Sequence, residues 1–262
     1  MNNFVLTGTM NGFFSVFRGT VGTLSLLDKL EDPNIFVYWN QTLYNDKTGE
    51  NAWEYYFEQI GIYKKQMNFV PHNILPREYS TRVEMNRLIN KYVKVKQPIQ
   101  DKVNTLVKKL GPNPLGVHIR MTDKNKCEEH GEPISGRPTA LEIYIKHINK
   151  YLNHNPDSKI YLATDDYNVL ATIRDKYEEK VVFSECIRSE GKTSIHHDLL
   201  GNNRLKGEQV LVDCMTLSKC NHLIKGISNV ALCAMFWNLD LTSENMNSIY
   251  NNDYREDFVC KL

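Results

Sequence analysis

Nine residues of the sequence, GVHIRMTDK at 116–124, combine an apolar run with four ionisable side chains. These are His118, Arg120, Asp123 and Lys124. Val117 and Ile119 have the character of a buried strand, and His118 and Arg120 alternate with them on the opposite strand face. The planar guanidinium of an arginine matches the oxygens of a phosphate. The stretch is therefore a candidate anion site at a strand end, although a structural ion pair of Arg120 with a carboxylate is the favoured interpretation of these residues alone.

A second candidate anion site is the sequence GISN at 226–229. A strand-like run ends at Gly226, and Ser228 and Asn229 open a helical pattern. Backbone N–H groups at a helix N-terminus, together with a hydroxyl, can bind an anion. An ordinary helix cap at Ser228 accounts for the same residues without a ligand.

Three carboxylates are further candidates. Asp165 and Asp166 end a strand-like run and could hold a divalent metal beside a diphosphate, although a helix cap by Asp166 is the favoured interpretation. Asp213 lies inside a helical pattern, so it is either partnered in the core or aimed at a ligand donor such as the N–H of a base. The sequence contains no HExxH, Walker A, zinc or GxSxG pattern.

The elements that would position these residues alternate between strand and helix from Pro112 onward. We expect strands at 114–120, 159–166, 180–185 and 221–226, and helices at 139–152, 167–177, 207–220 and 228–238, with Thr139 as a helix cap. This alternation predicts an α/β fold with a parallel sheet covered on both faces. Ligands of such sheets bind at the carboxyl ends of the strands, where Arg120, Asp165 and Ser184 fall.

The first half of the chain predicts a smaller α/β unit. Strands at 3–8 and 34–39 flank a helix at 19–32, a short helix follows at 51–60, and residues 78–110 read as two helices broken near Pro98. We place the boundary near Gly111, which gives domains of residues 1–111 and 112–262. Aromatic residues gather here and could line an acceptor groove for a sugar, although a buried aromatic core is favoured. They are Tyr38, Trp39, Tyr44, Trp53, Tyr55 and Tyr56.

The composition excludes several classes of protein. With 262 residues, 41% hydrophobic and 24% charged, the chain is globular, and its net charge of +1 gives no field that favours nucleic acid. No run approaches the length of a transmembrane span, and we see no signal peptide. The six cysteines are scattered without a CxxC, which favours reduced thiols and a cytoplasmic location, in a bacterium or in an infected host cell.

HIRMTDK resembles the HxRRxDK signature of the fucosyltransferase superfamily, which includes the α1,6-fucosyltransferases that modify N-glycans and Nod factors. Other stretches resemble blocks of that family in the same order. They are GFFSVFRG at 12–19, LATDD at 162–166 and GEQVLVDCMTLSKCNHLIKGISNVALCA at 207–234. NAWEYYFE at 51–58 resembles small bacterial and viral members of the family. The resemblance implies a GT-B-like fold, in which two Rossmann-like domains face each other across a cleft. The N-terminal domain would be the acceptor side, and the C-terminal domain would bind the nucleotide sugar.

The resemblance also implies roles for single residues. Arg120 would clamp the diphosphate, helped by Ser228 and Asn229. His118 and Asp213 would meet the nucleotide base. Lys124 would lie near the phosphates or the sugar.

The implied reaction is an inverting, metal-independent transfer of fucose from GDP-fucose to a glycan hydroxyl, with no cofactor. Glu128 stands four residues after the signature lysine, where related α1,6 enzymes carry their base, and Asp123 is the second candidate for that role. Met121 replaces the second arginine of the signature and leaves open another donor, such as UDP-xylose. A protein that binds a nucleotide or glycan without transfer is the remaining alternative.

Overall fold

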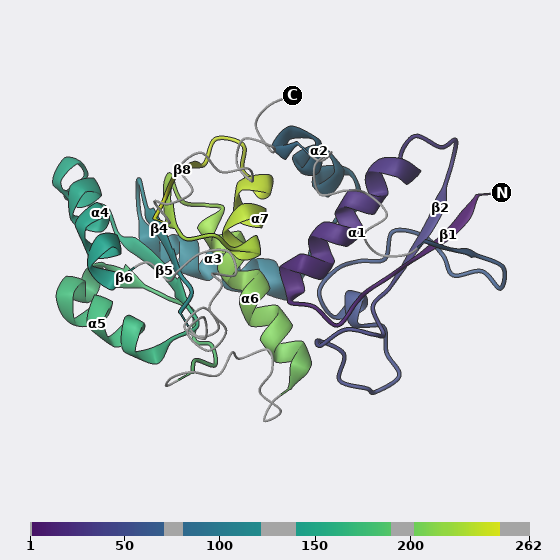
Figure 1. The fold of residues 1–262 in the computed structure, drawn as a ribbon, viewed down its shortest axis with the longest axis horizontal. Helices are drawn as coiled ribbons and strands as arrows, with labels where there is room; N and C mark the ends of the chain where they lie inside the picture. The colour runs from purple at the N-terminus through teal and green to yellow at the C-terminus, as the bar shows by residue number, and fades with distance from the viewer. Residues whose placement is uncertain (1, 71–80, 122–139, 190–201, 247–262) are drawn as a thin grey trace, which may run out of the picture. The chain divides into compact units, whose positions relative to one another are not determined.

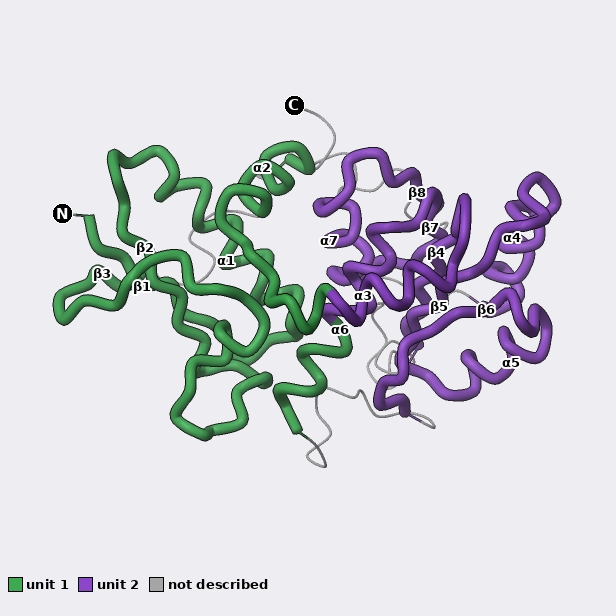
Figure 2. Tube along the Cα trace, turned by 180° about the vertical axis from the view of Figure 1, so that it is seen from behind, with its two compact units in different colours: residues 1–100, 201–210, 254–262 green, residues 101–200, 211–253 purple. Residues whose placement is uncertain are grey.

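The computed structural model describes residues 2–70, 81–121, 140–189 and 202–246. The chain forms two compact units (Figure 2). Unit 1 holds residues 1–100, 201–210 and 254–262, and unit 2 holds residues 101–200 and 211–253. In the described part of the chain, no helix has the length and apolar character needed to cross a membrane.

Unit 1 is built on a three-stranded parallel sheet of order β2-β1-β3. The strands are β1 (Asn3–Thr7), β2 (Asn34–Tyr38) and β3 (Asn68–Val70). Helix α1 (Phe13–Leu27) follows β1 and packs against α2 (Arg82–Tyr92). The expected strands are confirmed, whereas the helix begins at Phe13, earlier than position 19, because the extended backbone of Gly12 forms its N-cap.

Aromatic side chains fill the interior of unit 1. The ring of Phe13 lies 5.0–5.6 Å from those of Phe14, Trp39, Tyr44 and Tyr56. Of the six aromatic residues that the sequence left open, five are buried, which bears out the favoured interpretation of an aromatic core. These are Trp39, Tyr44, Trp53, Tyr55 and Tyr56, while Tyr38 is exposed.

One other expectation for this half needs correction, and one is confirmed. The segment at 51–60 forms only a short 3-10 helix (Ala52–Tyr55), whose N–H group at Trp53 is capped by the side chain of Asn51. The two helices expected over 78–110 are confirmed as α2 and α3 (Gln97–Leu110), and the break near Pro98 falls at residues 93–96. Pro98 sits in the first turn of α3, where a missing N–H costs no hydrogen bond.

Unit 2 contains a five-stranded parallel sheet of order β6-β5-β4-β7-β8. Strands β4, β5, β6 and β8 of this sheet are labelled in Figure 1. Its strands are β4 (Leu115–Ile119), β5 (Ile160–Thr164), β6 (Val181–Val182), β7 (His222–Lys225) and β8 (Thr242–Asn245). The predicted parallel sheet is confirmed. β6 is shorter than expected, and the edge strand β8 was not predicted because its sequence, TSEN, is polar.

Helices cover both faces of this sheet. Its helices are α4 (Leu141–His154), α5 (Tyr167–Tyr177), α6 (Asn203–Leu217) and α7 (Asn229–Trp237). On one face, side chains from α4 and α5 form an aliphatic core with alternate residues of β4 and β5. On the other face, Gly116 of β4 lies against Leu217 of α6, where a Cβ would come within 3.2 Å.

Two helix ends differ from the prediction. The N-cap of α4 is Ala140 rather than Thr139, which lies outside the described residues. Helix α6 begins at Asn203, four residues before the expected start, because Asn202 accepts a hydrogen bond from the N–H of Leu205.

Candidate active site

The carboxyl ends of β4 and β7 bring a histidine and a lysine together. His118 and Lys225 are direct partners across these neighbouring strands and are both buried. Burial lowers the pKa of His118 to about 3, and the charges of Arg120 and Lys225 act in the same direction. The imidazole is therefore neutral at physiological pH, and the positive charge of this edge comes from Arg120 and Lys225.

Arg120 directly follows β4 and remains partly exposed. Its Nε lies 4.0 Å from the Oδ2 of Asp165, which directly follows β5. Asp165 also accepts a hydrogen bond of 3.1 Å from the backbone N–H of Met121 through Oδ1. The structural ion pair that the sequence favoured thus exists, with a long distance of 4.0 Å between Nε and Oδ2.

Met121, which replaces the second arginine of the signature, packs against the aliphatic core of unit 2. Its side chain therefore contributes to packing rather than to the charge at the strand end. Asp166 caps α5, because its Oδ1 accepts hydrogen bonds from the N–H groups of Asn168 and Val169. The cap interpretation of Asp166 is confirmed.

Asp213 projects from α6 onto the same sheet face as His118. Its Oδ1 accepts a hydrogen bond of 2.7 Å from the hydroxyl of Tyr161 on β5 and one of 2.5 Å from the hydroxyl of Ser184. Burial raises the pKa of Asp213, and the two hydrogen bonds act against that shift. The carboxylate is thus partnered in the core, as one of the two interpretations expected.

The loop after β6 adds an arginine to this edge. The Nη2 of Arg188 donates to the carbonyl oxygen of Ser184 at 2.8 Å, and the guanidinium lies 5.4 Å from the ring centre of Phe183. The N–H of Ser189 donates to the carbonyl of Asp165 at 2.9 Å, which ties this loop to the end of β5.

The N-terminus of α7 follows β7 and contains two of the predicted site residues. Ser228 is the N-cap, and its hydroxyl accepts a hydrogen bond of 3.2 Å from the N–H of Val230. Asn229 is the first residue of the helix. The cap interpretation of Ser228 is confirmed, and an anion contact by either residue stays a prediction.

Three predicted site residues, Asp123, Lys124 and Glu128, lie outside the described residues. Within the described part of the chain, no group of three or more His, Cys, Asp or Glu side chains is placed to hold a metal ion.

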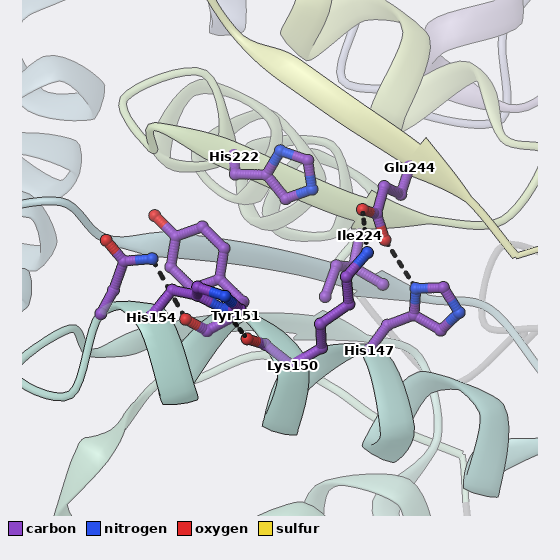
Figure 3. A pocket seen from close by; sticks show the side chains of 8 residues that line it. His147, Lys150, Tyr151, His154, His222, Ile224 and Glu244 are labelled. Atoms are coloured by element: carbon purple, nitrogen blue, oxygen red, sulfur yellow. Dashed lines mark hydrogen bonds and ion pairs between the residues drawn. The ribbon is translucent and has the colours of Figure 1, made fainter.

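A pocket of about 180 Å³ lies on the opposite face of the unit 2 sheet, against α4 (Figure 3). His147 and Lys150 both reach Glu244, with Nδ1–Oε2 and Nζ–Oε1 distances of 2.6 and 3.6 Å. The hydrogen bond from His147 lowers the pKa of Glu244. The ring of His222 stacks on Tyr151, with centroids 5.6 Å apart. These groups pair with one another, so the pocket offers less charge to a ligand than the strand ends do.

Sequence reasoning missed Lys225 and Tyr161 as members of the site. The signal for Lys225 was a lysine in the last position of an apolar strand, directly before Gly226. Tyr161 looked like a core residue, and its contact with Asp213 depends on how α6 packs on the sheet.

Comparisons with known proteins place this geometry in a family. Residues 83–251, well over half of the chain, match a model of the alpha-(1,6)-fucosyltransferase N- and catalytic domains. No curated protein matches the sequence.

Two groups of solved structures share the fold. NodZ alpha-1,6-fucosyltransferase soaked with GDP-fucose superposes with a TM-score of 0.61 at 15% identity, covering 91% of this chain and 93% of that one. Fucosyltransferase NodZ from Bradyrhizobium superposes with a TM-score of 0.56 at 13% sequence identity, and the match covers 90% of this chain and 93% of that one. POFUT1 in complex with GDP superposes with a TM-score of 0.57 at 10% sequence identity, and the match covers 94% of this chain and 98% of that one. These likenesses confirm the GT-B-like fold class. The chain is a glycosyltransferase and belongs to the alpha-(1,6)-fucosyltransferase family.

Proposed function

We propose that this protein transfers fucose from GDP-fucose to a hydroxyl of a glycan acceptor, with inversion and without a metal ion. The observation that carries the proposal is the positive edge of the unit 2 sheet. There Arg120 and the buried Lys225 end neighbouring strands beside the N-terminus of α7. NodZ was soaked with GDP-fucose and POFUT1 was solved with GDP, which supports a nucleoside diphosphate as the ligand.

In this proposal, the charge that develops on the leaving diphosphate is stabilised by Arg120, Lys124 and the helix terminus at Ser228 and Asn229. These groups supply the positive potential that a metal would otherwise provide. His118 and Asp213 contact the nucleotide base. The same reaction rate with and without EDTA is the expected result for a metal-independent transfer.

The acceptor hydroxyl must lose a proton as it attacks the sugar carbon. In this proposal Glu128 is the general base that accepts this proton, and Asp123 is the second candidate. Partial burial can raise the pKa of a carboxylate toward neutral pH, which suits this role. Residues 1–111 would provide the acceptor side, and residues 112–262 would bind the donor. The free thiols of Cys186, Cys214, Cys220 and Cys233 support a cytoplasmic site of action.

A UDP-sugar such as UDP-xylose is the second candidate donor. Met121 favours it, because the signature cation is missing and the side chain packs on the aliphatic core instead. Thermal-shift and hydrolysis assays with GDP-fucose, GDP-mannose, UDP-xylose and UDP-glucose decide between the two. Selective stabilisation by a UDP-sugar would reject GDP-fucose as the donor.

Arg120→Ala tests the phosphate site. Loss of one preorganised donor to a developing oxyanion costs about a hundredfold to a thousandfold in kcat, so we expect turnover to fall by at least that much at an unchanged melting temperature. Arg174→Ala, in α5 of the same unit, is the matched control and should keep its rate. Near-normal turnover by Arg120→Ala would remove the central claim, and so would nucleotide binding without release of a nucleoside diphosphate by the unmodified protein.

A further inference from the structure

Ser184, which follows β6, forms hydrogen bonds with two charged side chains. Its hydroxyl donates to Oδ1 of Asp213 at 2.5 Å, and its backbone carbonyl accepts from Nη2 of Arg188 at 2.8 Å. The carboxylate of Asp213 and the guanidinium of Arg188 are thus both hydrogen-bonded to the same residue, near the carboxyl edge of the sheet.

Asp213 and Arg188 are each held by hydrogen bonds that use only some of their polar atoms. Both hydrogen bonds that Asp213 accepts from described residues go to Oδ1, which leaves Oδ2 as its second acceptor. Arg188 uses Nη1 and Nη2 on the carbonyl oxygens of Cys186 and Ser184. Its Nε is buried and has no acceptor among the described residues. Buried N–H groups without a partner are rare in folded proteins, and an unfilled ligand site is one explanation.

The chemistry of this pair matches one class of nucleotide base. Guanine carries the acceptor O6 directly beside the donor N1–H, and uracil and hypoxanthine have the same lactam arrangement. Adenine and cytosine carry an amino donor beside a ring-nitrogen acceptor, which is the reverse order. A guanidinium beside a carboxylate therefore complements the lactam bases and opposes the other two.

We propose that Arg188 is a specificity-determining residue of the donor site, which together with Asp213 reads the lactam edge of the nucleotide base. The inference rests on the proposed function, because it assumes that a nucleotide sugar binds at this edge. The loop of Arg188 is continuous with the phosphate site, since Ser189 bonds to Asp165, the neighbour of Arg120. The positive charge of Arg188 also favours the ionised form of Asp213.

Phe183 provides a matched control for this arginine. The guanidinium of Arg174, an exposed residue of α5, lies 5.3 Å from the ring of Phe183, and that of Arg188 lies 5.4 Å from the same ring. Removing either arginine costs one cation–π contact on the same aromatic side chain. Arg188 alone of the two is hydrogen-bonded to Ser184 in the described structure.

The experiment measures the dissociation constants of GDP, IDP, UDP and ADP by calorimetry for the unmodified protein, Arg188→Ala, Arg188→Gln and Arg174→Ala. The unmodified protein should bind GDP and IDP more tightly than ADP. Loss of one charge-assisted hydrogen bond corresponds to about a tenfold to a hundredfold change in binding. We therefore expect both Arg188 variants to lose about that much of the preference for GDP over ADP, while Arg174→Ala keeps it.

The outcomes separate this inference from the proposed function. Equal weakening of GDP and ADP binding by the Arg188 variants would assign Arg188 to loop structure alone and overturn the inference. An unchanged preference would overturn it as well, while nucleotide binding itself would stand. If the unmodified protein bound none of the four nucleotides, the proposed function would fail first. Arg188→Gln keeps an amide NH2 group that can donate to the loop carbonyls, so it tests the inference if Arg188→Ala does not fold.

Discussion

Unit 1 packs around aromatic rings, whereas unit 2 has a mainly aliphatic core cluster against α4 and α5 and carries several charged side chains at the carboxyl ends of its strands. In unit 1 the ring of Phe13 contacts several others, and the three-stranded sheet ends without a comparable cluster of charge among the described residues. In unit 2 the core cluster that packs against α4 and α5 is mainly aliphatic, while Arg120, Asp165, Arg188 and Lys225 lie at or just past the strand ends. The buried aromatic side chains of unit 1 thus contribute to its stability, and the charged side chains at strand ends are concentrated in unit 2 among the described residues.

Glu128→Gln is the sharpest test of this division. Removal of a general base lowers the rate by about a hundredfold to ten-thousandfold, so kcat should fall by that amount. The dissociation constant of the donor should not change, because the base acts on the acceptor. Kinetics combined with calorimetry measure both quantities. If Glu128→Gln keeps its kcat and Asp123→Asn loses it, the base is Asp123.

Phe13→Ala should have the opposite effect: it should lower the stability of the fold and leave nucleotide binding unchanged. Phe13 is buried among five other rings, and removal of a buried phenylalanine costs about 3–5 kcal/mol of unfolding free energy. Urea unfolding measures this loss, and the nucleotide affinity of the folded fraction should stay the same. Phe69→Ala, at a side chain that is 74% exposed, is the control and should be nearly neutral. A large loss of nucleotide affinity in Phe13→Ala would break the comparison.

Asp28→Asn gives a smaller effect that depends on pH. Asp28 is the C-cap residue of α1, and hydrogen bonds from Lys91 and Tyr92 of α2 hold the pKa of its carboxyl well below the usual range. A carboxylate with a lowered folded pKa stabilises the protein above its unfolded pKa of about 4, and this stabilisation is lost as the pH falls toward the folded value.

We expect Asp28→Asn to cost about 1 kcal/mol at pH 7 and to flatten the acid side of the stability profile. Thermal unfolding at several pH values between about pH 3 and pH 7 measures this loss of stability, because that range includes the unfolded pKa of an aspartate. Exposed Glu31→Gln serves as the control. If the loss of stability at acid pH were the same in Asp28→Asn as in the unmodified protein, the hydrogen bonds of Asp28 with Lys91 and Tyr92 would not stabilise the packing of α1 on α2.

The parallel sheet of unit 2 could be predicted from its sequence because its strands are apolar and its helices are periodic. β4, β5 and β7 lie where the pattern put them, and so do the ends that carry Arg120 and Asp165. The polar strand β8 and the short strand β3 could not be found, because each becomes a strand through pairing with an interior neighbour.

The site was predictable to the extent that its residues are close in sequence or at strand ends. The contact of Tyr161 with Asp213 joins a strand to a helix 52 residues later, and no local pattern encodes it. The partnership of His118 with Lys225 likewise depends on the order of the strands, which places β7 directly beside β4.

The first turns of α6 belong to unit 1 and have a consequence for how the chain is made. The hydroxyl of Tyr56 donates to the carbonyl of Arg204, which is 148 residues later, and the amide of Asn203 donates to the carbonyl of Asn45. Gly207 is required here, since a Cβ would collide with the hydroxyl of Tyr56. During translation the amino-terminal residues therefore leave the ribosome without the segment that completes their fold. Unit 1 can finish folding only after residues 101–200 of unit 2 have been synthesised.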